Sequence, residues 1–196
     1  MRVIAGSLRS RPLLAPSGLD TRPTADRLRE TLFNVLTQGA MDRVAGAAFL
    51  DLYAGSGAVG IEALSRGAAS VTFVEQGAPA LAILSKNLSN LGIRSPNVRV
   101  EKRSAGPFLR MALEKNAAQP FSAVFLDPPY DLAEEYTNTL GLLGGEGAAL
   151  LAPTAWVVAE HRRKHPLPAE FGRLRRIRLL QEGDAALSFY QLAETL

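Results

Sequence analysis

The chain contains no cysteine among its 196 residues, and only two histidines. The absence of cysteine excludes disulfide frameworks, thiolate metal sites and thiol nucleophiles. His161 and His165 are the only imidazole groups. No eighteen apolar residues follow one another, and the start of the chain, residues 1–9, has too short an apolar run for a signal peptide. We therefore expect a cytoplasmic protein with no membrane span and no metal centre.

The residues that are present favour one globular domain with an uneven charge. A hydrophobic content of 47% is enough to form a real core, and no second domain is required. Residues 1–43 and 161–196 each carry a net charge of +3, whereas residues 44–160 carry −3. Basic ends around an acidic middle are typical of a protein that binds a polyanion with its flanks, although a solvated basic surface gives the same pattern. We predict an N-terminal extension that contacts RNA or substrate (1–43), a catalytic domain (44–196) and a monomer.

The hydrophobic pattern predicts alternating strands and helices. Short apolar runs rich in valine and phenylalanine alternate with longer amphipathic stretches, which indicates repeated βαβ units and a parallel sheet covered on both faces. The predicted strands are 47–53, 70–75, 97–102, 121–127 and 154–160. The predicted helices between them are 58–66, 79–91, 105–116 and 132–143.

Both ends of the chain have a different pattern. Residues 2–5 and 12–15 are short extended candidates around a turn, and Thr24 is a candidate N-cap for a helix. After residue 173 the alternation of side chains, broken by a turn at 182–184, predicts two antiparallel strands that close the sheet. Trp156 lies inside a predicted strand, where we expect it in the core.

A glycine-rich loop follows the first predicted strand. Gly55, Gly57 and Gly60 have the G-x-G-x-x-G spacing, which lets a ligand approach the backbone closely. The next predicted strand ends in Glu75, where a carboxylate can accept hydrogen bonds from ribose hydroxyls. Asp51 repels a pyrophosphate but attracts the ammonium group of a methionine moiety. The loop therefore favours S-adenosylmethionine over a dinucleotide.

The second motif is the tetrapeptide Asp127-Pro128-Pro129-Tyr130, which ends an apolar run. Proline has a fixed φ and no N–H, and it forces the preceding residue into extended geometry, so the carbonyls point outward in a preset direction. The Asp127 carboxylate and the Pro128 carbonyl can accept both N–H bonds of a nucleobase amine and turn its lone pair toward an electrophile. Tyr130 can stack on the same base. A strand followed by a proline turn without any function would have the same sequence, but the presence of the glycine loop in the same chain favours the functional interpretation.

In this order, the two motifs resemble class I S-adenosylmethionine-dependent methyltransferases that act on exocyclic amines, over about residues 45–196. Residues 2–6, 21–34 and 51–68 are more specifically similar to the RsmD family of 16S ribosomal RNA guanine-N2 methyltransferases. The resemblance implies a Rossmann-like α/β fold with a mostly parallel seven-stranded sheet and helices on both faces. A small N-terminal extension, made of a β-hairpin and a helix, would precede it.

The resemblance also implies an activity: transfer of one methyl group from S-adenosylmethionine to N2 of a guanine in 16S rRNA. The substrate would be the small ribosomal subunit or its assembly intermediate. The motif Asp127, Pro128, Pro129 and Tyr130 would be catalytic. The cofactor would contact the glycine loop and the ends of neighbouring strands, namely Asp51, Tyr53, Ala54, Gly55, Ser56, Gly57, Gly60, Glu75, Ser104 and Ala105.

The chain departs from the family pattern at Ser104, where the family usually has an aspartate that contacts the adenine amine of the cofactor. Serine can accept one hydrogen bond there but brings no charge. Candidate substrate contacts in the N-terminal region are Arg9, Arg11, Arg22, Thr24 and Arg29. Exposed charges and ion pairs along a capped helix would explain the same residues equally well. Arg162, Arg163 and Lys164 are further candidates for phosphate contacts.

Three other functions remain open. An adenine-N6 methyltransferase acting on RNA or DNA would use the same motif, although 196 residues leave no separate target-recognition domain for a sequence-specific DNA enzyme. A nicotinamide-dependent oxidoreductase would explain the glycine loop but neither Asp51 nor the motif at 127–130. A non-catalytic RNA-binding module would leave both sites without a role.

Overall fold

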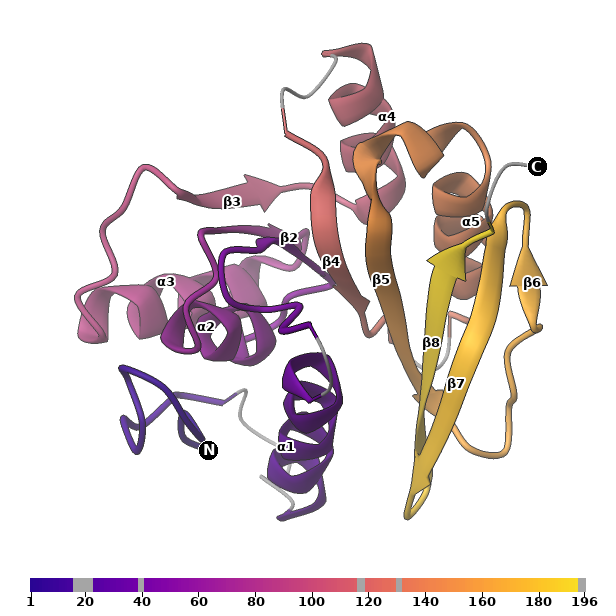
Figure 1. The fold of residues 1–196 in the computed structure, drawn as a ribbon. Helices are drawn as coiled ribbons and strands as arrows, with labels where there is room; N and C mark the ends of the chain where they lie inside the picture. Colours follow the sequence, from indigo (N-terminus) through magenta and orange to yellow (C-terminus); the bar gives the residue numbers. More distant parts are fainter. Residues whose placement is uncertain (16–22, 39–40, 116–118, 130–131, 194–196) are drawn as a thin grey trace.

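The computed structural model describes residues 1–15, 23–38, 41–115, 119–129 and 132–193. Within these residues the chain forms one eight-stranded sheet with helices on both faces (Figure 1). In chain order the elements are α1 (Pro23–Thr37), β1 (Ala48–Leu52), α2 (Ala58–Ser65), β2 (Ser70–Glu75), α3 (Ala78–Asn90), β3 (Val98–Lys102), α4 (Ala105–Glu114), β4 (Phe121–Leu126), α5 (Ala133–Gly144), the 3-10 helix η1 (Glu146–Leu150), β5 (Leu151–Arg162), β6 (Glu170–Phe171), β7 (Leu174–Glu182) and β8 (Ala185–Leu192).

The strand order is β3-β2-β1-β4-β5-β8-β7-β6. Strands β1 to β5 pair in parallel, and β5 to β8 continue the sheet with antiparallel pairs. The chain runs outward from β1 through β2 to β3 and then returns to β4 on the other side of β1. In open α/β sheets the crevice at such a reversal, beyond the carboxyl ends of the strands, is where ligands bind.

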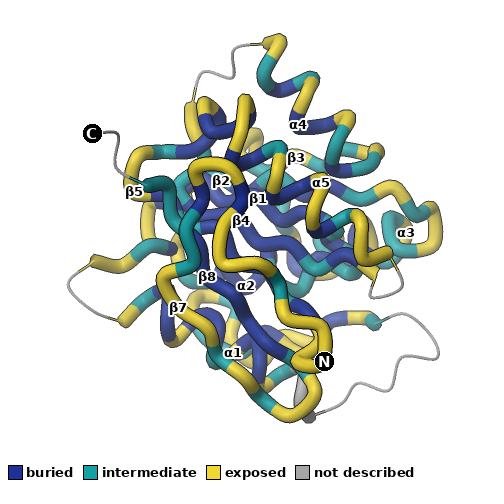
Figure 2. The backbone as a smooth tube through the Cα atoms, turned by 90° about the vertical axis from the view of Figure 1, so that its right-hand side faces the viewer, coloured by how far each residue is buried: buried dark blue, intermediate teal, exposed yellow. Residues whose placement is uncertain are grey.

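Each face of the sheet has its own hydrophobic layer. On one face α1, α2 and α3 contribute side chains such as Leu32, Ile61 and Leu84, which pack with Phe49 and Phe73 of the sheet. On the opposite face α4 and α5 pack over a second cluster. The strands β1, β4 and β8 are accordingly buried along most of their length (Figure 2). A strand covered on both faces has a continuous apolar run, as these sequences have.

The predicted helices and strands of residues 47–160 are confirmed, with boundaries that differ by at most three residues. The predicted strand count of seven is wrong by one, because β6 has only two residues and is too short to show periodicity. The expected N-terminal β-hairpin is a single antiparallel bridge between Arg2 and Pro12. Helix α1 begins at Pro23, so Thr24 is not its N-cap. Proline is favoured in the first turn, where its missing N–H is not needed.

The segment 1–15 is attached to the sheet domain by buried polar side chains. The Glu62 carboxylate of α2 is fully buried and accepts hydrogen bonds from the backbone N–H groups of Ile4 and Ala5, at 2.7 and 3.0 Å. The same carboxylate forms a 2.8 Å ion pair with Arg66. Because each of these backbone donors would otherwise be unsatisfied, Glu62 fixes the path of the segment.

Two more buried residues extend this attachment. The Ser65 hydroxyl accepts from the N–H of Leu8, and the Asn87 side chain bonds both the N–H and the carbonyl of Leu14. Gly6 has φ +81°, and an added Cβ there would lie 1.8 Å from the Ser65 carbonyl oxygen. Only glycine allows the backbone to approach α2 this closely. No helix in the described ranges is both long enough and apolar enough to cross a membrane.

Candidate active site

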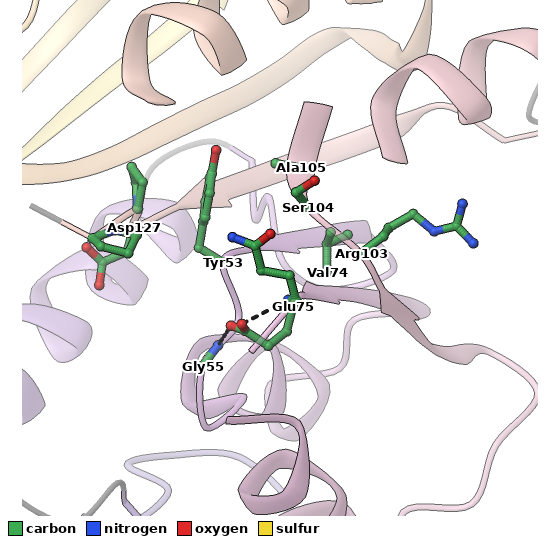
Figure 3. A pocket seen from close by; sticks show the side chains of 11 residues that line it. Tyr53, Gly55, Val74, Glu75, Arg103, Ser104, Ala105 and Asp127 are labelled. Carbon is green, nitrogen blue, oxygen red and sulfur yellow. Dashed lines mark hydrogen bonds between the residues drawn. The ribbon is translucent and has the colours of Figure 1, made fainter. Parts of the chain in front are cut away.

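Two cavities open at the carboxyl ends of β1, β2 and β4. The first cavity has a volume of about 430 Å³, and its lining consists of Tyr53, Gly55, Val74, Glu75, Gln76, Arg103, Ser104, Ala105, Asp127, Pro128 and Pro129 (Figure 3). The second cavity, of about 280 Å³, lies toward α1. Tyr53, Gly55 and Asp127 line both cavities. The two spaces therefore meet at the loop after β1 and the tip of β4.

The glycine loop joins β1 to α2 through several left-handed residues. Gly55 and Gly57 have φ of 57° and 80°, and Tyr53 has φ of 61°, which is uncommon for a residue with a side chain. Gly57 and Gly60 do not line either cavity. An added Cβ would lie 2.3 Å from the Leu84 side chain at Gly57 and 2.3 Å from the Phe73 ring at Gly60. These two glycines let α2 pack closely, whereas Gly55 faces the cavities.

Asp51, in β1, is a buried carboxylate at the wall of the second cavity. Its Oδ2 accepts a hydrogen bond from the N–H of Gly60 at 2.8 Å. Burial raises the pKa of Asp51 to about 8, the Gly60 bond opposes the increase, and the charge of Glu75 adds to it. A carboxylate held in this way gains from a cationic partner, since the partner replaces the lost hydration.

This arrangement argues against a pyrophosphate at the glycine loop. An amide near the start of α2, that of Gly60, already donates to an internal carboxylate, so a negatively charged ligand would meet Asp51 instead of free donors. The ammonium group of an amino acid suits the same position.

Glu75 ends β2 and connects the glycine loop to the two residues that precede α3. Its Oε2 accepts from the N–H of Gly55 at 2.8 Å, and its Oε1 accepts from the N–H groups of Gln76 and Gly77 at 2.9 and 2.7 Å. The side chain also lines the first cavity, on the opposite side of Tyr53 from Asp127 (Figure 3). An ionised carboxylate has about four acceptor positions, which leaves capacity for ligand hydroxyls.

The far wall of the first cavity comes from the loop between β3 and α4. Ser104 occupies the N-cap position of α4, where its hydroxyl makes no capping hydrogen bond within the described part of the chain. Ala105 follows it, and Arg103 and Val74 complete this wall. The Ser104 hydroxyl is therefore placed to hydrogen-bond a ligand in the cavity, which is consistent with a contact to an adenine amine.

Asp127 lies at the boundary between the cavities, and Pro128 and Pro129 line the first one. Burial raises the pKa of the half-buried Asp127 well above its ordinary value, and the negative charges of Glu160 and Asp51 raise it further. The Pro128 carbonyl accepts a hydrogen bond from the Tyr136 hydroxyl of α5 at 3.4 Å. One lone pair of that oxygen is thus directed into the protein, and the other remains for a ligand.

Tyr130, the fourth residue of the motif, lies outside the described residues, as does Arg22. Thr24 lies in α1, but its side chain is outside the described part. Arg9 is exposed in the N-terminal turn. The guanidinium of Arg11 donates to the Asn90 carbonyl of α3 at 3.2 Å.

Arg29 is buried instead of exposed and lines the second cavity. Its Nη2 donates to the carbonyl of Arg2 at 2.6 Å and to Asp26 at 3.0 Å, the latter an ion pair between residues three apart on α1. Its Nε has no hydrogen-bond partner among the described residues.

Sequence reasoning missed several lining residues. In the first cavity these are Val74, Gln76 and Arg103, which flank predicted site residues. In the second cavity they include Leu28 and Leu32 of α1, Phe125 of β4, Glu160 of β5 and Leu187 of β8. The position of Glu160 at the end of a predicted strand was a usable signal, because parallel strands place their carboxyl ends at one edge.

The residues present fit S-adenosylmethionine. Asp51 would offer a carboxylate to the amino acid end, Glu75 would offer acceptors to ribose hydroxyls, and Ser104 would offer a polar contact to the base. No group of three or more His, Asp or Glu side chains in the described ranges is arranged to hold a metal ion.

Solved structures share this architecture. The structure of "Putative methyltransferase yhhF from Escherichia coli" superposes with a TM-score of 0.77 at 38% identity, and the match covers 98% of this chain and 97% of that one. The fold and the site together define a class I S-adenosylmethionine-dependent methyltransferase.

The model of the RsmD family, described as "Conserved hypothetical protein 95", matches residues 1–191, and the chain belongs to this family. "Ribosomal RNA small subunit methyltransferase D" of Escherichia coli (strain K12) is 39% identical over 170 residues, which is 86% of this chain and 78% of the relative. "Putative rRNA methyltransferase YlbH" of Bacillus subtilis (strain 168) is 36% identical over 191 residues, or 97% of this chain and 98% of the relative.

Proposed function

We propose that this protein transfers a methyl group from S-adenosylmethionine to the exocyclic N2 amine of a guanine in the 16S rRNA of the small ribosomal subunit. One observation carries the proposal: the first cavity, which fits the adenosine part of the cofactor, and the second cavity, whose wall includes Asp51, meet at Asp127. The relatives named as rRNA methyltransferases support the rRNA part. The guanine N2 position follows from the resemblance of the N-terminal stretches to the RsmD family.

The chain's contribution to the reaction is positioning and electrostatics. When bound, S-adenosylmethionine supplies a methyl group on a sulfonium, which is the electrophile. Asp51, Glu75 and Ser104, which line the two cavities, would hold this ligand at its amino acid, ribose and base ends. Direct transfer needs the nucleophile and the methyl carbon within about 3–3.5 Å, which converts a bimolecular step into an oriented one.

Asp127 and the free lone pair of the Pro128 carbonyl accept the two N–H bonds of the target amine. Held in this way, the amine directs its lone pair at the methyl carbon instead of into the ring. A nitrogen–carbon bond forms, the sulfur–carbon bond breaks, and the sulfur keeps that electron pair. The nitrogen then loses one proton, to Asp127 or to solvent.

The geometry requires an accessible base. The N2 amine of a guanine stacked in a helix cannot reach a tip recessed between two cavities, so the base must be flipped out or already lie in a loop. Tyr130 would stack on that base. We also propose that residues 1–43 help to hold the RNA, with Arg9 as an exposed cation in this segment.

The test is transfer of labelled methyl to small subunits that lack the modification, to free 16S rRNA and to DNA, followed by nucleoside analysis. N2-methylguanosine in the subunit sample is the expected product. N6-methyladenine would keep the chemistry and replace the target base. Binding of S-adenosylmethionine without any transfer would contradict the proposal.

The variant Asp127→Ala tests the role of the carboxylate in methyl transfer. We expect it to abolish transfer while cofactor affinity, measured by calorimetry, stays within a few-fold of the wild type, because Asp51, Glu75 and Ser104 would still hold the cofactor. Turnover by this variant at a rate close to the wild type would remove Asp127 from the mechanism.

A further inference from the structure

Glu160 and Asp127 are neighbours on adjacent parallel strands. In the register of β4 and β5, Phe125 lies beside Val158 and Leu126 beside Ala159, so the next pair in line is Asp127 and Glu160. Adjacent strands lie about 4.8 Å apart, and paired residues of a parallel ladder project from the same face. The buried Phe125 and Val158 belong to the cluster under α1. The side chains two residues further therefore project to the α1 face as well.

Two further observations place the carboxylates together. Both residues line the second cavity. The charge of Glu160 is the strongest electrostatic contribution that raises the pKa of Asp127. On its other side Glu160 pairs with Leu187 of β8, which also lines the cavity.

The remaining walls suit a flat heteroaromatic ring. The second cavity has a volume of about 280 Å³, and its apolar sides are formed by Leu28 and Leu32 of α1, Phe125 and Leu187. Ligand cavities are commonly apolar with a few polar groups that fix the orientation. Here the acidic groups at one end require hydrogen-bond donors from the ligand.

Guanine and adenine differ in this respect. Next to its exocyclic amine, the Watson–Crick edge of guanine carries a second donor, N1–H. Adenine has an unprotonated acceptor nitrogen at position 1. A carboxylate beside the amine-binding group accepts from the guanine N1–H but meets the lone pair of adenine. With adenine the carboxylate would receive no hydrogen bond from position 1 of the base, and a site whose polar group loses its ligand partner in this way strongly disfavours the wrong base.

We infer that Glu160 is a specificity-determining residue that accepts a hydrogen bond from N1–H of the target guanine while Asp127 holds the adjacent N2 amine. This inference rests on the proposed function. The two neighbouring carboxylates then recognise two adjacent donors of the guanine edge, and Glu160 has a role beside Asp127.

The test uses a base that keeps the amine and lacks N1–H. In 2,6-diaminopurine the 2-amino group is present, but position 1 is an acceptor. Small subunits are reconstituted from ligated rRNA that carries either guanine or 2,6-diaminopurine at the nucleotide methylated in the first experiment. The kcat/KM for methyl transfer is measured on both substrates with the wild type, with Glu160→Gln and with Glu160→Asp. Glu114→Gln, an exposed carboxylate on α4, is the control.

We expect the wild type to prefer guanine by about 10- to 100-fold, the usual cost of an unpaired polar group at a reading site. Glu160→Gln can donate its amide N–H to the acceptor of 2,6-diaminopurine, so the preference should fall at least about tenfold or invert. Glu160→Asp keeps a carboxylate and should still prefer guanine, with a lower kcat/KM. Glu114→Gln should behave as the wild type.

A ratio of two rates is unaffected by the fraction of a variant that folds. If Glu160→Gln slows both substrates by the same factor, or if the wild type does not discriminate between them, the inference is wrong while the proposed function stands. If the wild type methylates neither substrate, the proposed function fails, and the inference fails with it.

Discussion

At the scale of the residue, burial of the Asp51 carboxylate lowers the stability of the free protein and favours a cationic ligand group. Its carboxylate is buried and its pKa is raised to about 8 from an ordinary value of 3.8. The folded state therefore prefers the protonated form. A bound ammonium group would favour the charged form and lower this pKa again.

Asp51→Asn should stabilise the free protein at pH 8 and leave it unchanged at pH 4. Because the folded pKa is raised, wild-type stability is complete below the unfolded value near 4 and is lost as the pH rises toward 8. Asparagine has no such loss. The midpoint of thermal unfolding should rise by about 2–4 °C for each kcal/mol recovered. The same variant should bind S-adenosylhomocysteine at least about tenfold more weakly. Equal stability differences at both pH values would contradict this account.

Tyr53 connects the glycine loop to α5. Its hydroxyl lies 2.6 Å from Glu135 Oε2 and 2.7 Å from Thr139 Oγ1, and its backbone is left-handed. Burial and the bond to Glu135 both raise the pKa of the hydroxyl, so it keeps its proton and donates to the carboxylate.

Tyr53→Phe should lower the free energy of unfolding by about 1–2 kcal/mol, because the buried Thr139 hydroxyl and Glu135 lose a partner while the ring is kept. Urea unfolding measures this change. Tyr136→Phe is a useful comparison, because it removes the donor to the Pro128 carbonyl and keeps the Tyr53 bonds. We expect Tyr136→Phe to lower kcat more than cofactor affinity. An unchanged stability of Tyr53→Phe would show that the hydroxyl contacts add nothing.

At the scale of the element, the segment 1–15 depends on α2. Its Ile4 and Ala5 N–H groups donate hydrogen bonds to the fully buried Glu62 carboxylate. The same carboxylate forms an ion pair with Arg66 and lies 3.9 Å from the Arg29 side chain. This segment carries Met1 and Ala15, which line the second cavity. The attachment therefore shapes the cavity as well as the fold.

Glu62→Ala should destabilise the protein by about 3–5 kcal/mol, since it leaves two backbone donors and the partly buried Arg66 without their acceptor and removes an acid next to the buried Arg29. Urea unfolding measures the change in the free energy of unfolding. Hydrogen exchange should become faster at the N–H groups of Ile4 and Ala5, which donate hydrogen bonds to Glu62 in the wild type. Glu114→Ala removes an exposed carboxylate of the same size and should change stability by less than about 0.5 kcal/mol. Protection at Ile4 that survives Glu62→Ala would mean that other contacts hold the segment.

At the scale of the whole molecule, the basic C-terminal flank begins at the edge of the sheet that carries Asp127. Arg163 and Lys164 are exposed and directly follow the carboxyl end of β5, which points to the same edge as Asp127. This position suits contacts to the phosphates around a flipped base.

Arg163→Ala combined with Lys164→Ala should weaken binding to the small subunit and reduce the slope of log affinity against log salt by about 1 to 2. Lys86→Ala combined with Arg110→Ala removes the same charge from exposed positions on α3 and α4 and serves as the control. Filter binding over a range of salt concentrations measures both. Equal losses in the two double variants would indicate a general effect of net charge instead of a binding surface at this edge.

The sequence by itself determined the alternation of helices and strands, the glycine loop and the acceptors at the tip of β4. These features depend on short-range periodicity and on backbone preferences of glycine and proline, which are local properties. Hence the predicted strands at 70–75 and 121–127 agree with β2 and β4 to within a residue. The two-residue β6 has no such local signal.

Only the tertiary structure decided which side chains share a cavity. The placement of Glu160 beside Asp127 depends on the register of β4 and β5, and the burial of Arg29 depends on how α1 packs against the N-terminal segment. Both are contacts between residues far apart in the sequence. Pairing register and helix packing are set by the complete core. The end of the predicted strand at residue 160 indicates the edge at which Glu160 lies, but only the register shows that Asp127 is its neighbour.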